Sequence, residues 1–141
     1  RRGYSITRAC MSRNPQLDFI PLNGLPESKV AEKLKQSGMF LATSEGEWFG
    51  LPALEAMAAG CLVLSVPVRG GTEYLHDGDN CLVKDAALLP DSLYQISRPE
   101  NDDLRTELRY RAVAAAATYT RTRQRHRLQA LKKTDLQWLF A

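Results

Sequence analysis

Two glutamates stand eight positions apart in a short polar stretch of the sequence. Glu47 lies in the loop that starts at Ser44, and Glu55 lies one turn into the helix expected after it. Carboxylates accept bidentate hydrogen bonds from hydroxyl groups, so a pair that faced one cleft could bind a sugar or a ribose. The pair could also be the two carboxylates of a glycosidase, and Glu55 alone could simply complement the helix dipole.

The helix expected to start near Leu51 also offers backbone amides to an anion. First-turn amides have no partner within a helix and carry the positive end of its dipole, so they suit a phosphate group. Gly50 would let an anion approach the backbone closely. Pro52 removes one N–H and leaves those of Gly50, Leu51, Ala53 and Leu54 available. The stretch therefore predicts an anion site next to the carboxylates.

The surrounding segments alternate between strands and helices, which must position these groups. Short apolar runs predict strands at 18–22, 39–43, 62–66 and 81–83. Helices are predicted at 27–37, capped by Gly38, and at 52–59, followed by Gly60, with a short helical piece at 73–75. Short links between such elements indicate an α/β fold, a doubly wound parallel sheet with helices on both faces. Ligands bind at the carboxyl ends of such strands.

The last third of the chain predicts helices of a different character. Asn101 to Asp103 are expected to cap a long helix that runs from Leu104 through the alanines at 112–117. Threonines at 118, 120 and 122 predict a break before a second helix at about 121–133. We therefore expect a core at residues 1–103 and basic helices at 104–141 that pack on the same domain.

Charge divides the chain in the same way and leaves a second hypothesis open. Residues 1–103 hold 10 Lys and Arg against 14 Asp and Glu, whereas residues 104–141 hold 9 against 2. A basic end can bind nucleic acid or an anionic membrane, or form a solvated helix face. Alternate arginines at 121–127 would point in several directions on a helix, so nucleic acid is not favoured. The alternative function is a non-catalytic interaction module that binds a partner, nucleic acid or membrane through these helices.

Composition excludes several other classes. The 141 residues are 44% hydrophobic and 25% charged, as in globular proteins, and the most apolar stretch, 56–68, is too short to span a membrane. Three cysteines without close spacing argue against disulfides or zinc, and His76 and His126 show no metal-binding spacing. We expect a cytoplasmic protein with no metal or cofactor. The start, without Met or an apolar leader, is expected to be an excised or processed one.

The segment from Ser44 to Gly60 resembles the E-x7-E signature of retaining glycosyltransferases with the GT-B fold, the large sucrose-synthase-like and mannosyltransferase-like group. Glu47 and Glu55 fall on its two glutamates. Further segments resemble the family in the same order: 19–24 with the following helix, 70–73 with its Gly-Gly-Thr-Glu, and 77–80 with its Asp-Gly-Asp-Asn. The resemblance covers roughly residues 18–85.

The resemblance implies roles for the residues of this stretch. Glu55 would bind the ribose hydroxyls of a nucleotide-sugar donor, and Glu47, the catalytic candidate, would contact the donor's sugar ring. The backbone amides of Phe49, Gly50 and Leu51 would meet the sugar and the diphosphate. This agrees with the anion site predicted from the helix N-terminus.

A second loop belongs to the same implied site. Gly70, Gly71 and Glu73 would line the cleft at the neighbouring strand end, although a plain strand-to-helix turn explains them as well. The implied reaction transfers a sugar, in the manner of a hexosyltransferase, from a nucleotide-diphosphate donor to an acceptor hydroxyl with retention. Catalysis would be electrostatic, because the helix N-terminus stabilises the departing diphosphate.

The chain also departs from the family's pattern. A complete enzyme of this fold has two doubly wound domains with the acceptor site largely on the N-terminal one, and 141 residues have room only for the C-terminal one. The family's diphosphate clamp has no match in Arg1, Arg2 or Arg8, and Cys81 stands where the family often has Gly. We expect a fragment with weak donor binding and no transfer activity alone, whose partner is the missing N-terminal domain. Peripheral contact with a membrane is a further expectation.

Overall fold

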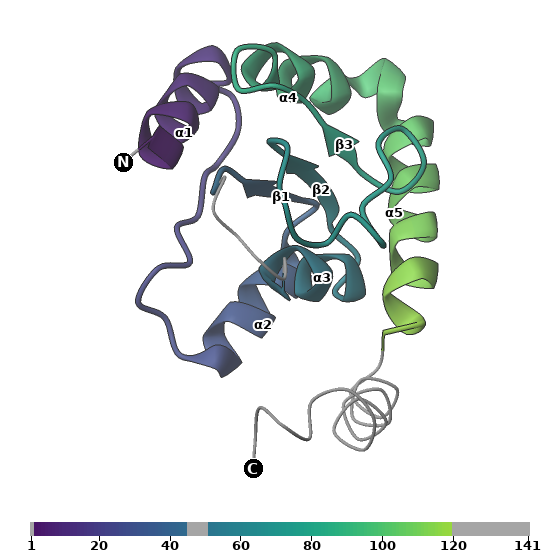
Figure 1. The fold of residues 1–141 in the computed structure, drawn as a ribbon. Helices are drawn as coiled ribbons and strands as arrows, with labels where there is room; N and C mark the ends of the chain where they lie inside the picture. Colours follow the sequence, from purple (N-terminus) through teal and green to yellow (C-terminus); the bar gives the residue numbers. More distant parts are fainter. Residues whose placement is uncertain (1, 45–50, 120–141) are drawn as a thin grey trace.

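The structure is a computed structural model, and it describes residues 2–44 and 51–119 (Figure 1). These residues form an α/β fold around a three-stranded parallel sheet. The strands lie in the order β1-β2-β3 and are β1 (Met39–Ala42), β2 (Leu62–Ser65) and β3 (Leu82–Val83). The helices are α1 (Arg2–Arg13), α2 (Glu27–Gln36), α3 (Leu51–Ala58), α4 (Leu89–Ser97) and α5 (Asp102–Ala117), with a 3-10 turn η1 (Pro99–Asn101).

The central strand, β2, is covered on both faces. Its register places Leu62 opposite Met39 and Ser65 opposite Ala42 of β1, and Ser65 also lies opposite Val83 of β3. All four residues of β2 are buried. A continuous apolar run is what a parallel strand between two helical layers requires, because both of its faces meet apolar side chains.

Alternate residues of β2 belong to opposite core clusters. Val63 packs in a cluster with residues of α2, α3 and α5. Leu62 and Leu64, with Val66 just after the strand, pack in a second cluster with residues of α1 and α4. Figure 1 shows α1 and α4 on one side of the sheet and α2 and α3 on the other. The predicted parallel sheet with helices on both faces is therefore confirmed.

Polar contacts from Arg13 and Asn14, at the end of α1 and just after it, hold α1 against α4. Arg13 Nε donates to Asp91 Oδ1 at 2.7 Å. The buried Asn14 donates through Nδ2 to the carbonyl oxygen of Pro90 at 3.1 Å and to that of Cys10 at 2.9 Å. These contacts join the end of α1 to the first turn of α4.

Helix α5 joins the two layers. Leu108 lies in the cluster with α1 and α4, whereas Ala112 and Ala116 lie in the cluster with α2 and α3. Arg109 Nε donates to the carbonyl oxygen of Gly60 at 2.6 Å, just beyond the C-terminal end of α3. A cation at this end complements the helix dipole. Helix α5 is therefore held in place by its packing in both core clusters and by the bond from Arg109 to Gly60.

Most of the predicted elements are present. The helices predicted at 27–37 and 52–59 are α2 and α3, and the strands predicted at 39–43, 62–66 and 81–83 are β1, β2 and β3. Gly60 follows α3 with a φ of 90°, the left-handed conformation that favours glycine after a helix. Helix α5 ends at Ala117, directly before the first of the predicted helix-breaking threonines. The second helix predicted at 121–133 lies outside the described residues.

The strand predicted at 18–22 is wrong, because none of the described strands pairs with this segment. Phe19 packs against the cluster of α1 and α4, and Leu22 packs against the cluster of α2 and α3. The segment carries the chain from one face of the sheet to the other, so its apolar residues pack in the core clusters on both faces. It ends in the turn predicted at Asn23–Gly24, where Gly24 has a φ of 76°.

Two further local predictions are wrong. The helical piece predicted at 73–75 is instead a turn at 72–74, in which the carbonyl oxygen of Gly71 accepts from the N–H groups of Tyr74 and Leu75 at 3.1 and 2.9 Å. Gly38 is not a left-handed cap, since Ser37 ends α2 in an extended conformation. The carbonyl oxygen of Gly38 instead accepts from the N–H of Leu62 at 2.9 Å.

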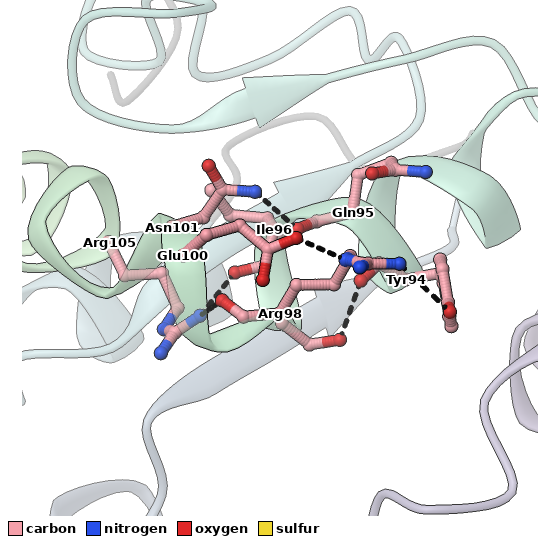
Figure 2. Close-up of polar contacts among 8 residues, drawn as sticks. Tyr94, Gln95, Ile96, Arg98, Glu100, Asn101 and Arg105 are labelled. Atoms are coloured by element: carbon pink, nitrogen blue, oxygen red, sulfur yellow. Dashed lines mark hydrogen bonds and ion pairs between the residues drawn. The ribbon is translucent and has the colours of Figure 1, made fainter.

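The cap predicted at 101–103 is wrong, because α5 already starts at Asp102 and receives no capping hydrogen bond from the side chain of Asn101. Its Nδ2 donates to the carbonyl oxygen of Gln95 at 2.6 Å (Figure 2). Arg105 Nη1 reaches back from α5 to the carbonyl oxygens of Ile96 and Arg98, at 2.5 and 2.8 Å. These side chains satisfy carbonyls at the C-terminal end of α4, which have no partner within that helix.

Candidate functional site

The candidate site lies where β1 and β2 end. Because the strands are parallel, the segments that follow Ala42 and Ser65 leave the sheet at the same edge. The N–H of Val66 donates to the carbonyl oxygen of Ala42 at 3.2 Å, so the two strand ends remain paired up to this edge. Helix α3 connects these two parallel strands, and a crossover helix of this kind starts at the carboxyl edge.

The first turns of α1 reach the same edge. A Cβ atom added to Gly3 would lie only 3.0 Å from the carbonyl oxygen of Thr43, so the two backbones are in close contact. Thr7 Oγ1 donates to the carbonyl oxygen of Gly3 at 2.9 Å and lies 3.0 Å from Thr43 Oγ1. Sequence reasoning missed this contact, since nothing in the spacing of residues 2–13 marks it.

Glu55 lies on the exposed side of α3. Its neighbours Ala53, Leu54, Ala56 and Met57 are all buried in the core cluster of that layer, whereas Glu55 is exposed. The helix therefore presents this carboxylate to solvent. The N–H groups of Leu51 and Ala53 lie in the first turn of α3. N–H groups at this position have no hydrogen-bond partner within the helix.

The segment at 70–73 follows β2 and contains a left-handed glycine. Gly71 is buried with a φ of 85°, and its carbonyl oxygen closes the turn described above. Glu73 is exposed. Tyr74 and Leu75, which come next, belong to the same core cluster as the buried residues of α3. The 70–73 segment and α3 are thus anchored in one layer.

The remaining predicted site residues lie outside the described residues. These are Glu47, Phe49 and Gly50, while Leu51 is described as the first residue of α3. The structure thus places Glu55, Gly70, Gly71 and Glu73 on elements that leave the carboxyl edge or start at it.

The turn at 77–80 is held together by its own side chains. Asp77 Oδ1 accepts from the N–H of Val83 at 2.9 Å, and Asp77 Oδ2 lies 3.3 Å from Lys84 Nζ. The buried Asn80 donates through Nδ2 to the carbonyl oxygen of Tyr74 at 2.8 Å and accepts through Oδ1 from the N–H of His76 at 3.0 Å. This turn fixes the backbone between the 70–73 segment and β3.

The three cysteines are buried and reduced. Burial raises the pKa of the Cys10 thiol to about 11 and, with the nearby charges of Asp77 and Asp79, that of Cys81 to about 12. Burial also raises the pKa of Cys61, whose Sγ donates to the carbonyl oxygen of Leu34 at 3.1 Å. Protonated, enclosed thiols are poor nucleophiles, so these groups fill space.

A pocket of about 360 Å³ lies beside the C-terminal end of α4 and is lined by Gln16, Tyr94, Ser97, Arg98 and Pro99. The guanidinium of Arg13 lies 3.9 Å from the centre of the Tyr94 ring and pairs with Asp91. Arg98 Nε pairs with Glu100 Oε1 at 2.5 Å, and Arg98 Nη1 donates to the Tyr94 hydroxyl (Figure 2). Arg98, the charged residue in the lining of this pocket, is therefore already paired.

The described residues form neither a metal-binding cluster nor a membrane-spanning helix. Within 2–44 and 51–119, no three acidic, histidine or cysteine side chains gather closely enough to hold a metal ion. No helix in these ranges combines the length and apolar character that a membrane span requires. His76 is exposed, and His126 and the arginines at 121–127 lie outside the described residues.

A protein-family model described as "Glycosyl transferases group 1" matches residues 10–113. The alpha-1,6-glucosyltransferase of Actinobacillus pleuropneumoniae serotype 7 (strain AP76) is 36% identical over 53 residues, which are 38% of this chain and 16% of that protein. The N-acetyl-alpha-D-glucosaminyl L-malate synthase of Bacillus anthracis is 38% identical over 77 residues, 52% of this chain and 20% of that protein. The chain thus aligns with at most a fifth of each relative.

A solved structure resembles the fold. The C-terminal domain of a glycosyl transferase group 1 family protein from Francisella tularensis superimposes with a TM-score of 0.58 at 21% sequence identity. The superposition covers 83% of this chain and 63% of that domain. The likeness places the parallel sheet and its helices in the same Rossmann-like architecture.

Proposed function

We propose that this chain, which belongs to the group 1 glycosyl transferase family, binds the nucleotide-diphosphate sugar from which such an enzyme transfers its sugar. The observation that carries the proposal is the place of Glu55. It is an exposed carboxylate on α3, a helix that starts at the edge where α/β sheets bind their ligands. The family match spans this edge from α1 to α5.

In this proposal each group acts through its ordinary chemistry. Glu55 accepts hydrogen bonds from the ribose hydroxyls, since a carboxylate can accept from two hydroxyls at once. The first-turn amides of α3 face the diphosphate, because they carry the positive end of the helix dipole. Glu47, Phe49 and Gly50 complete the donor site from the segment before α3, and Gly70, Gly71 and Glu73 border it after β2.

The proposed reaction moves the sugar from the diphosphate to an acceptor hydroxyl with retention of configuration. Negative charge develops on the departing diphosphate, and the amides at the start of α3 stabilise it. Transfer of a hexosyl group and the need for an N-terminal domain with the acceptor site are parts of the same proposal. They concern the whole enzyme, of whose relatives this chain covers a fifth or less.

The first experiment titrates the chain calorimetrically with UDP-, GDP-, ADP- and dTDP-sugars. The variants are Glu55→Gln and, as a matched control, Glu32→Gln, which changes an exposed glutamate of α2 that pairs with Lys29 at 3.2 Å. We expect one nucleotide class to bind. Glu55→Gln should weaken that binding about tenfold to a hundredfold, the cost of losing a charged hydrogen-bond acceptor, and Glu32→Gln should leave it unchanged.

Two results would contradict the proposal. One is the absence of binding to every nucleotide sugar at millimolar concentration, both by this chain and by the chain joined to an N-terminal domain. The other is equal weakening by the two variants. Salt-dependent binding to polyanions without any nucleotide-sugar binding would favour the interaction module instead.

A further inference from the structure

We infer that Tyr74 and Tyr119 position the glycine loop, defined as residues 70–73, so that the end of α5 sets the geometry of one wall of the donor site. The inference rests on the proposed function, because it concerns the loop that borders the proposed donor. Both tyrosines act through the loop and are positioning residues, with no contact to donor implied.

Tyr74 closes the glycine loop from the core side. A Cβ atom added to Gly71 would lie 2.8 Å from Tyr74 Oη and 2.9 Å from Tyr74 Cζ, so the phenol ring lies directly against the α-carbon of Gly71. The side chain of Tyr74 is only 3% exposed. Its N–H also donates to the carbonyl oxygen of Gly71 at 3.1 Å. The position of the Tyr74 ring therefore limits where the backbone of Gly71 can lie.

Tyr119, two residues after the end of α5, packs against that ring. The two rings meet edge to face, with centroids 5.4 Å apart and planes at 63°, a favoured arrangement of aromatic pairs. The Tyr119 hydroxyl also donates to the carbonyl oxygen of Glu73 at 3.5 Å, the long limit of a hydrogen bond. The N–H of Tyr119 bonds the carbonyl oxygen of Ala116 at 3.0 Å, so its backbone is anchored in the last turn of α5.

The far side of Tyr74 is fixed independently. Asn80 binds the carbonyl oxygen of Tyr74, as described above, and Arg111 of α5 lies 3.4 Å from Asp79 in the same turn. The backbone after the glycine loop is thus held by the 77–80 turn. Tyr119, just after α5, contacts the glycine loop in two ways: its ring packs on Tyr74, and its hydroxyl reaches the carbonyl oxygen of Glu73.

The test compares Tyr119→Leu, Tyr119→Phe and the matched control Tyr110→Leu, all in the full 141-residue chain. Tyr110 lies on α5, the helix that precedes Tyr119, and is 77% exposed. The amide resonances of Gly70, Gly71 and Glu73 are followed by NMR, and the affinities for UDP, GDP, ADP and dTDP are measured by calorimetry. Urea unfolding shows that each variant is folded.

Tyr119→Leu should shift the three amide resonances and weaken the preferred nucleotide about three- to tenfold, because small displacements of a binding group are costly. Tyr119→Phe keeps the ring and should restore both readouts to near the parent values. Tyr110→Leu should change neither. Rescue by Phe separates the ring contact from the long hydroxyl bond.

The inference is overturned if the parent binds a nucleotide, Glu55→Gln weakens that binding as expected, and Tyr119→Leu binds as the parent does. It is overturned equally if Tyr119→Leu lowers stability alone and leaves the loop resonances in place. Absence of binding by the parent and by the chain joined to an N-terminal domain would instead contradict the donor site, and the inference with it. The two failures are therefore distinguishable.

Discussion

Gly71 meets two demands that a residue with a side chain cannot meet together. Its φ of 85° lies in the left-handed region, and the space for a Cβ atom is filled by the Tyr74 ring. Gly78 has a similar φ of 78° but nothing within 4 Å of the added atom. Gly38 has neither feature, since its φ is not positive and its surroundings are open. Comparing the three glycines therefore distinguishes the effect of a left-handed backbone from the effect of a steric overlap with Tyr74.

Alanine substitutions at these positions should follow that order. Gly71→Ala should lower the free energy of unfolding by about 2–4 kcal/mol, from left-handed strain and overpacking together. Gly78→Ala should lower it by about 1–2 kcal/mol from strain alone, and Gly38→Ala should change it by less than about 1 kcal/mol. Urea denaturation followed by circular dichroism measures all three. Equal losses of unfolding free energy for Gly71→Ala and Gly78→Ala would show that the Tyr74 ring moves aside at little cost.

At the scale of elements, sequence patterns located the strands better than the helices. β2 is apolar except for Ser65 at its end, and α3 has Pro52 in its first turn and Gly60 after its end, so both could be predicted. Helix α1 escaped prediction because, among its residues, only Ile6 and Cys10 are buried. Two apolar residues on one face give too weak a helical pattern to predict α1 from the sequence.

Helix α4 and the site contacts were missed for different reasons. Leu89, Leu93 and Ile96 are buried at helical spacing, so the signal for α4 was present in the sequence. Glu55 and the glycine loop could be predicted because each lies within a local pattern. The contact of Tyr74 with Tyr119 could not, since it joins residues far apart in the chain and depends on how α5 crosses the core.

The two leucines at the start of α4 give a matched test of its packing. Leu89 is fully buried in the cluster with α1, whereas Leu88, the residue before the helix, is 57% exposed. Leu89→Ala should lower the free energy of unfolding by about 2–5 kcal/mol through lost burial and a cavity. Leu88→Ala should change it by no more than about 0.5 kcal/mol. Thermal and urea unfolding of both variants distinguish these outcomes.

For the whole molecule, the two core layers share β2 and α5. Leu108 and Ala112 lie one turn apart on α5 and belong to opposite clusters. A single helix that is buried in both layers couples their unfolding, so we expect one cooperative transition for the described core. The buried thiols lie in both layers as well, with Cys10 in one and Cys61 and Cys81 in the other.

These thiols make the stability of the fold depend on pH in the alkaline range. The folded pKa values of Cys10 and Cys81, about 11 and 12, lie above the ordinary value of 9.0. Below pH 9 this contribution is fully present, and it is lost as the pH rises towards 11 or 12, because the unfolded chain releases its thiol protons first. Each thiol should lower the free energy of unfolding by about 1 kcal/mol per pH unit in that window.

Urea unfolding at several pH values between about 8 and 10 checks this slope. Cys81→Ala should reduce the slope, while its cavity lowers stability by a similar amount at every pH. A variant with the same slope as the parent would show that other groups, such as lysines and tyrosines, cause the alkaline loss.

The polar contacts between α1 and α4 bear on the order in which the chain folds. Arg13 and Asp91 are 78 positions apart and Asn14 and Pro90 are 76 apart, whereas the N–H of Cys61 bonds the carbonyl oxygen of Ala56 within one turn of chain. Contacts that close long loops cost more chain entropy and tend to form late. Helix α1 should therefore be the last to dock and the first to detach, and its detachment would break the Thr7–Thr43 contact at the edge of the sheet while β1 and β2 stay paired.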